Sequence, residues 1–173
     1  MASISSPRRG ASRDSSLFLA TRQQPMDRQT IEAITRTSDP YLWIDEVVQI
    51  DDDQIHARKY LSPEMPIFGA HFANFPLFPG ALQCEAAFQA SAVLLARTLP
   101  SRESEIPVIA RVRDVQFRQM VRPGDTIDVV VTREEQFGPA VSLRGRVSVG
   151  DQVSTRLAFV ATQAAGPEEN AAG

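Results

Sequence analysis

The sequence predicts an α+β fold in which an antiparallel sheet curls around one long, buried helix. Residues 80–99 are rich in alanine and leucine, lack proline and internal glycine, and end at Pro100, so they predict the longest helix. Apolar residues occur on nearly every side of it, which is typical of a helix surrounded by protein. Strand-like segments separated by glycine-containing turns follow, at 107–112, 115–120, 126–134, 140–149 and 152–162.

The region before the long helix predicts a short helix, a hairpin and an irregular loop. Residues 27–35 form a helix pattern with Asp27 as N-cap. Residues 41–50 and 54–60 predict two strands joined by an acidic turn. Residues 63–79 hold four prolines and four phenylalanines, and this proline density excludes a regular helix or a central strand. We therefore expect an ordered aromatic loop over the core.

A single domain suits a chain of 173 residues of which 43% are hydrophobic, and we expect it to span residues 26–162. Residues 1–25 are rich in Ser, Arg and Gln and predict a disordered extension. Their composition also resembles an organelle transit peptide, but the simpler interpretation is a sequence upstream of a natural start at Met26. Residues 163–173 predict a flexible tail.

The composition excludes several classes of protein. A formal net charge of -3 gives no basic footprint for nucleic acid. The single cysteine, Cys84, excludes an internal disulfide and a CxxC zinc site, and its apolar surroundings predict a structural thiol. No apolar run reaches the roughly 18 residues that span a bilayer, so we expect a cytoplasmic protein without membrane contact.

The residues best suited to chemistry lie between positions 71 and 89. His71 is in the proline-rich loop, and histidine is the side chain that most often serves as a general base. Glu85 lies in the second turn of the long helix among apolar neighbours, which suits a general acid. The helix begins at Gly80, where an unpaired backbone N–H suits an oxyanion. By residue type alone, a structural histidine and a surface glutamate are the more common alternatives.

His71 and Glu85 belong to a longer pattern with fixed spacing, His-Phe-x-x-x-Pro-x-x-Pro-Gly-x-Leu-x-x-Glu-Ala-x-x-Gln. This pattern resembles the active-site signature of FabZ-type 3-hydroxyacyl-[acyl-carrier-protein] dehydratases. Residues 40–47 are similar to the family's opening strand with its Asp-x-Val turn. Residues 115–125 are similar to its phenylalanine–arginine strand and Pro-Gly-Asp turn. The resemblance covers residues 28–162, nearly all of the chain that is expected to be ordered.

The resemblance implies a hot-dog fold, in which a sheet wraps a long central helix and two subunits join their sheets edge to edge. His71 of one subunit would face Glu85 of the other, and the Gly80 N–H would polarise the thioester carbonyl. The implied reaction removes water from a (3R)-3-hydroxyacyl thioester on an acyl carrier protein and gives the trans-2-enoyl thioester, without a metal or organic cofactor. The implied assembly is a homodimer, with a trimer of dimers or a heterodimer as alternatives.

The resemblance also suggests roles for residues around this pair. Gln89, one helical turn from Glu85, would hold its carboxyl group, with an ordinary buried amide as an equal alternative. An acyl tunnel would be lined by aromatic side chains, namely Phe72, Phe75, Phe78 and Phe117. An acidic carrier protein requires a basic surface. The candidates for it are Arg111, Arg113, Arg118 and Arg122. The alternative interpretation of these residues is ordinary solvated charges on strands.

The loop departs from the family pattern Gly-His-Phe-Pro-Gly-His-Pro. Ala70 and Asn74 stand at glycine positions, and Phe75 stands at a second histidine position. The acid and the base are intact, so the changes indicate a divergent member that serves fatty-acid, polyketide or polyene biosynthesis. Two alternatives stay open. One is an acyl-thioester hydrolase on the same fold, and the other is a non-catalytic partner subunit of a heteromeric dehydratase.

Overall fold

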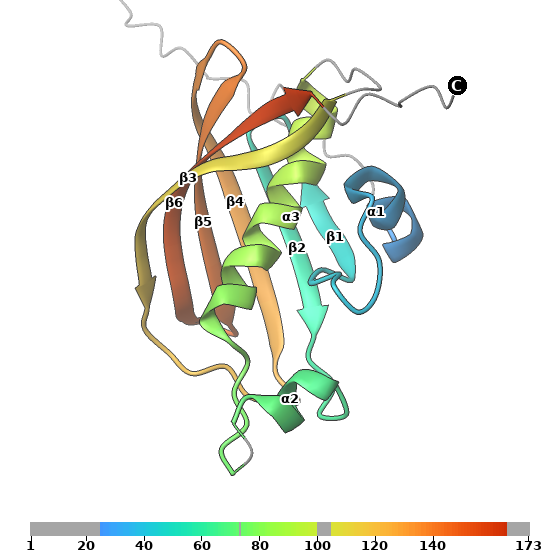
Figure 1. Ribbon diagram of the computed structural model, residues 1–173, viewed down its shortest axis with the longest axis vertical. Helices are drawn as coiled ribbons and strands as arrows, with labels where there is room; N and C mark the ends of the chain where they lie inside the picture. Colours follow the sequence, from blue (N-terminus) through green and yellow to red (C-terminus); the bar gives the residue numbers. More distant parts are fainter. Residues whose placement is uncertain (1–24, 73, 100–104, 166–173) are drawn as a thin grey trace, which may run out of the picture.

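The structure, a computed structural model, describes residues 25–72, 74–99 and 105–165. They form a six-stranded antiparallel sheet in the order β1-β2-β4-β5-β6-β3, and one long helix, α3, lies across a face of it (Figure 1). The short helix α1 packs beside α3 and β1, while α2 lies near the end of the molecule where α3 begins (Figure 1). The predicted α+β fold class is therefore confirmed.

The elements are as follows. The helices are α1 (Arg28–Thr35), α2 (Pro66–Ala70) and α3 (Gly80–Thr98). The strands are β1 (Glu46–Ile50), β2 (Gln54–Tyr60), β3 (Glu105–Phe117), β4 (Thr126–Phe137), β5 (Ala140–Val149) and β6 (Gln152–Ala165). Within the described part of the chain, no helix is both long and apolar enough to cross a bilayer.

The core lies between α3 and the inner face of the sheet. Most of α3 is buried, as the sequence predicts, and small side chains let it approach the strands closely. A Cβ atom at Gly145 of β5 would lie 3.2 Å from the Cβ of Ala87 and 2.6 Å from a methyl carbon of Leu157. Gly145 therefore sets the distance between α3 and β5, because any side chain at this position would displace its neighbours.

Several predicted elements are confirmed. The helix at 27–35 is α1, and the carboxylate of Asp27 caps it by accepting a hydrogen bond from the backbone N–H of Thr30 at 2.9 Å. The long helix begins at Gly80 and ends at Thr98, one residue before the predicted end. The strands predicted at 54–60 and 140–149 coincide with β2 and β5.

Two predictions for the first half of the chain were wrong. Residues 41–45 do not begin a strand, because the carbonyl of Tyr41 and the backbone N–H of Trp43 bond to the side chain of Gln89 on α3. The proline-rich loop does contain a regular helix, α2. Pro66 is at its first turn, where a missing backbone N–H breaks no helical hydrogen bond.

Three strands of the second half, β3, β4 and β6, differ from their predicted bounds. The strands expected at 107–112 and 115–120 are one strand, β3, which ends at Phe117, so residues 118–120 are not part of it. The register of β3 with β6 shifts between Ile109 and Arg111 and again between Arg113 and Gln116, where Asp114 has a φ of 52°. β4 continues to Phe137 and β6 to Ala165, so residues 163–165 belong to the sheet and not to a tail. The predicted extension and the rest of the tail, residues 1–24 and 166–173, lie outside the described residues.

The edge strand β3 presents an apolar surface. Val112, Val115 and Phe117 expose 43%, 37% and 60% of their surface. One side of β3 pairs with β6, and its other side has no neighbouring strand in the described chain. Long, apolar edge strands are a template for pairing with another chain. This edge is thus the part of the sheet best suited to subunit association.

Candidate active site

His71 lies in the loop between α2 and α3. Its backbone N–H donates to the carbonyl of Ile67 at 2.9 Å, and its carbonyl accepts from the backbone N–H of Leu77 at 3.0 Å. The imidazole is half-buried, and its ring centroid lies 4.1 Å from that of Phe72. Hydrogen bonds of the His71 backbone N–H and carbonyl therefore fix the position of the Cα atom that carries the imidazole.

The hydrogen bond of the His71 ring determines which nitrogen is free. Nδ1 lies 3.1 Å from the carbonyl oxygen of Leu77. Because a carbonyl oxygen only accepts hydrogen bonds, Nδ1 carries the proton of the neutral imidazole and Nε2 keeps its lone pair. Among the described residues, Nε2 has no hydrogen-bond partner. An imidazole in this tautomer is able to remove a proton at Nε2.

Glu85 lies in the second turn of α3, and its carboxyl group is held by Gln89. The amide Nε2 of Gln89 donates to Glu85 Oε1 at 3.1 Å and to the carbonyl of Tyr41 at 2.7 Å. Its Oε1 accepts from the backbone N–H of Trp43, also at 2.7 Å. Exchanging the nitrogen and oxygen would set donor against donor and acceptor against acceptor. Gln89 therefore holds Glu85 with an amide that has only one possible orientation.

Two neighbours of Glu85 have raised pKa values, because of burial and the charge of Glu85. Burial raises the pKa of the Cys84 thiol, and the negative charge of Glu85 raises it further. Partial burial also raises the pKa of the Tyr41 phenol, with a second contribution from Glu85. Cys84 is only 8% exposed. A buried thiol with a raised pKa is a poor nucleophile, which agrees with a structural role.

The start of α3 lies against an aromatic ring. A Cβ atom at Gly80 would lie 2.6 Å from the ring of Phe117, so only glycine leaves room for this ring. Pro79 precedes the helix and supplies no side-chain cap. The backbone N–H groups of Gly80 and Ala81 therefore point out of the helix end with its partial positive charge. This geometry suits the stabilisation of an oxyanion.

The four aromatic residues predicted to line a tunnel fall into two groups. Phe72, Phe75 and Phe117 expose 56%, 46% and 60% of their surface. Phe78 is 2% exposed, and its ring centroid lies 5.3 Å from that of Trp43. Phe78 therefore belongs to the core beneath the loop, whereas the other three are available at the surface.

The four arginines predicted to meet a carrier protein, at positions 111, 113, 118 and 122, are all exposed. The guanidinium of Arg122 lies 5.1 Å from the centroid of the Phe75 ring. Arg118 donates to Gln116 at 2.6 Å and borders a groove of about 450 Å³ on the sheet. Three further arginines line this groove and were not predicted, namely Arg144, Arg146 and Arg156. The sequence pattern does not show which strands are neighbours in the sheet, so it could not place these arginines beside Arg118.

A single chain does not bring His71 and Glu85 together. A pocket of about 150 Å³ beside Glu85 is lined by residues such as Thr37, Phe88 and Ile109, but not by His71. Within the described residues, no hydrogen bond or ion pair joins the two side chains. In the same part of the chain, no group of three or more His, Cys, Asp or Glu residues could hold a metal ion. Each chain therefore presents His71 and Glu85 at places that do not touch.

Known proteins resemble this chain over most of its length. The family of FabA-like domains matches residues 37–157. A 3-hydroxyacyl-[acyl-carrier-protein] dehydratase FabZ from Latilactobacillus sakei is 34% identical over 131 residues, which cover 75% of this chain and 88% of that protein. A bifunctional enzyme LpxC/FabZ from Porphyromonas gingivalis is 31% identical over 137 residues, which cover 79% of this chain but only 30% of that longer protein.

Solved structures show the same architecture at low identity. The dehydratase heterocomplex ApeI:P from Xenorhabdus doucetiae matches with a TM-score of 0.65 and 16% identity, covering 78% of this chain and 90% of that chain. Thioesterases are also among the structures with this fold. The hot-dog fold is thereby confirmed. The chain belongs to the FabA-like domain family, as a divergent relative of the FabZ 3-hydroxyacyl-[acyl-carrier-protein] dehydratases.

Proposed function

We propose that this protein removes water from a (3R)-3-hydroxyacyl thioester on an acyl carrier protein and forms the trans-2-enoyl thioester, in fatty-acid, polyketide or polyene biosynthesis. The observation that carries the proposal is the joint retention of His71, with Nε2 free, and Glu85, held by Gln89. Relatives that are 31% and 34% identical are FabZ dehydratases, which supplies the substrate class. The geometry supports a base at His71 and an acid at Glu85.

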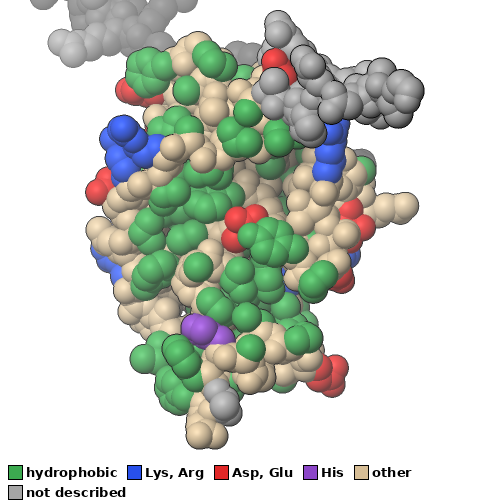
Figure 2. Space-filling view, viewed as in Figure 1, with side chains coloured by type: hydrophobic (Ala, Val, Ile, Leu, Met, Phe, Trp, Pro, Cys, Tyr) green, Lys and Arg blue, Asp and Glu red, His purple; other side chains and the backbone are tan. Residues whose placement is uncertain are grey.

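A second subunit completes the proposed site. The free edge of β3 would pair with the same edge of another copy and cover Val112 and Val115. The molecular face that carries α3 and the α2 loop displays many apolar side chains, as expected of a surface that another subunit covers (Figure 2). In such a homodimer, or in a trimer of dimers or a heterodimer, His71 would meet Glu85 of the partner subunit.

The proposed reaction is a pair of proton transfers. Nε2 of His71 takes the α-proton, and the released electron pair forms the double bond as the bond to the 3-hydroxyl oxygen breaks. Protonated Glu85 donates to the leaving hydroxyl, directly or through water, so that water departs. The Gly80 N–H bonds the thioester oxygen, and one such donor is worth about 3–4 kcal/mol in the enolate-like state. Proton return from His71 to Glu85 through solvent restores both groups, and this balance needs no cofactor.

The acyl chain is proposed to lie along the apolar surface between subunits, beside Phe72, Phe75 and Phe117. The pocket beside Glu85 and a second one of about 280 Å³ share Thr35, Ala92 and Pro107, so the space continues along α3. A continuous space of this kind suits an extended chain. Phe78 would support the loop from the core. The carrier protein is proposed to meet the basic surface that includes Arg111, Arg113, Arg118 and Arg122.

Mass spectrometry of the products tests the function directly. The protein is incubated with 3-hydroxyacyl thioesters of an acyl carrier protein, and the expected product is the thioester that has lost one water. A free acid together with the unloaded carrier would instead identify a thioester hydrolase. Turnover that begins only after a second hot-dog chain is added would identify a partner subunit.

A further inference from the structure

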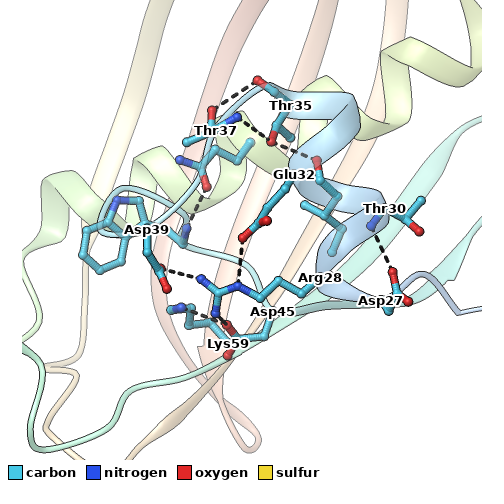
Figure 3. A network of polar contacts seen from close by, with 12 residues as sticks. Asp27, Arg28, Thr30, Glu32, Thr35, Thr37, Asp39, Asp45 and Lys59 are labelled. Carbon is cyan, nitrogen blue, oxygen red and sulfur yellow. Dashed lines mark hydrogen bonds and ion pairs between the residues drawn. The ribbon is translucent and has the colours of Figure 1, made fainter.

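Four charged residues on α1, on β2 and at the two ends of residues 39–45 form a cluster (Figure 3). Arg28 of α1 pairs with Asp39 and, at 3.3 Å, with Asp45. Lys59 of β2 donates to the same Asp45 carboxylate at 2.8 Å, and the backbone N–H of Tyr60 donates to it at 3.0 Å. We call Arg28, Asp39, Asp45 and Lys59 the Arg28 cluster. The proposed mechanism does not use any of them.

The Arg28 cluster joins two regular elements to one loop. Lys59 is only 5% exposed, and Asp45 is its one ion-pair partner among the described residues. A buried ammonium group requires a partner, so Asp45 is tied firmly to β2. Arg28 Nε also forms an ion pair with Glu32 Oε1 on the next turn of α1, at 3.1 Å, which restricts the conformation of the guanidinium. The cluster therefore fixes Asp39 and Asp45 relative to both α1 and β2.

Asp39 and Asp45 are the two ends of an irregular segment, residues 39–45. The strand β1 begins only at Glu46, so no sheet ladder positions residues 41–44. The middle of the segment bonds to the Gln89 amide through the carbonyl of Tyr41 and the N–H of Trp43. A displacement of the segment would consequently displace the Gln89 amide, because both bonds determine where it lies.

Gln89 in turn bonds directly to the carboxyl group of Glu85. We propose that the Arg28 cluster positions Glu85, acting through the segment at residues 39–45 and the amide of Gln89. Arg28, Asp39, Asp45 and Lys59 are thus positioning residues that never touch the substrate. This inference rests on the proposed role of Glu85 as the acid of the dehydration.

The chain offers a matched control for Arg28. The side chain of Arg58 is 40% exposed, against 37% for Arg28, and it also pairs with carboxylates, at 3.2 Å and 3.4 Å. Those carboxylates, Asp128 and Glu46, lie outside the segment at residues 39–45. Arg28→Gln and Arg58→Gln therefore remove the same kind of side chain and similar surface ion pairs, but only the side chain of Arg28 pairs with carboxylates inside the segment.

Steady-state kinetics of the full-length variants tests the inference. Arg28→Gln is expected to lower kcat about tenfold or more with KM nearly unchanged, because a misplaced acid loses its geometry while the substrate still binds. Arg58→Gln should keep the wild-type kcat, and Arg28→Lys should recover part of the loss. Asp39→Asn, at a side chain that is 70% exposed, should fold normally and change kcat in the same direction as Arg28→Gln. Equal losses in the Arg28→Gln and Arg58→Gln variants, in step with their melting temperatures, would overturn the inference.

A double-mutant cycle separates positioning from a general structural role. Once Gln89→Met has cut the link to Glu85, adding Arg28→Gln should lower kcat no further. Additive losses would show that Arg28 acts by another route.

The side-chain amide signals of Gln89 in NMR spectra give a second measurement that does not depend on activity. They should shift in the Arg28→Gln protein and not in the Arg58→Gln protein. A wild type without dehydration would refute the proposed function, whereas unshifted Gln89 signals in Arg28→Gln would refute the positioning.

Discussion

The chain holds its proposed acid and its proposed base in different ways. Glu85 lies on a largely buried helix, and a buried amide with three hydrogen bonds fixes its carboxyl group. His71 leaves an exposed aromatic loop, and one ring bond to the carbonyl of Leu77 orients it. Contacts within one subunit therefore determine the position of the proposed acid. The surroundings of the base, beside Phe72 and Phe75, depend on what covers this loop.

Removal of either group is expected to have the largest effect. His71→Ala and Glu85→Gln should each lower the dehydration rate by about 10²–10⁴-fold, the usual contribution of a positioned base or acid. Both side chains are half-buried and lie outside the core cluster, so the variants should fold. Product mass spectrometry measures the rate, and circular dichroism checks the fold. A His71→Ala protein that kept nearly full activity would remove the imidazole from the mechanism.

The difference between the two groups also predicts complementation between inactive proteins. If His71 works with Glu85 of the partner subunit, mixing His71→Ala with Glu85→Gln chains creates dimers in which one of the two sites is intact. Random exchange should restore about a quarter of the wild-type activity, because half of the dimers are mixed and each has one complete site. The activity is followed after refolding the two proteins together. No recovery, despite mixed dimers seen by native mass spectrometry, would place both groups in one chain.

The sequence predicts the scaffold of the acid better than the surroundings of the base. The helix at residues 80–98 has a strong apolar pattern and a proline stop, so its start and end follow from local chemistry. The spacing from Glu85 to Gln89 also follows from helical periodicity, and the hydrogen bond between them is present. These features need no knowledge of distant neighbours.

Several features that the sequence did not predict depend on long-range contacts. Residues 41–44 have a strand-like composition, but the Gln89 side chain takes the hydrogen bonds that a neighbouring strand would have supplied. Phe78 is similar in sequence context to Phe75, yet one is in the core and the other is exposed. The pairing of Arg28 with Asp39 and Asp45 joins α1 to a loop that no local pattern places beside it. Tertiary packing decides each of these, not propensity.

A smaller effect is expected at the junction between the two regions, where Phe117 lies against Gly80. Gly80→Ala would put a Cβ atom within 2.6 Å of the ring, which is exposed and free to move away. We expect kcat/KM to fall about tenfold, because the wall of the site shifts relative to the helix start. Phe117→Leu provides the control. If displacement of the ring is the cause, Gly80→Ala should cost much less activity in the Phe117→Leu background than in the wild type.

The smallest effect is expected at Cys84, which is adjacent to Glu85 on α3 but faces the core. Cys84→Ala should leave kcat unchanged and lower the free energy of unfolding by about 0.5–1.5 kcal/mol, as for other small losses of buried volume. The raised pKa of the folded thiol adds a pH dependence. When the pH rises above the ordinary thiol value of 9.0, the unfolded chain loses its proton first, so the wild type loses stability relative to Cys84→Ala. Urea unfolding at pH 7 and pH 10 measures this difference. Fast alkylation of the native thiol at pH 8, or a loss of kcat in Cys84→Ala, would contradict its purely structural role, because an inert buried thiol permits neither.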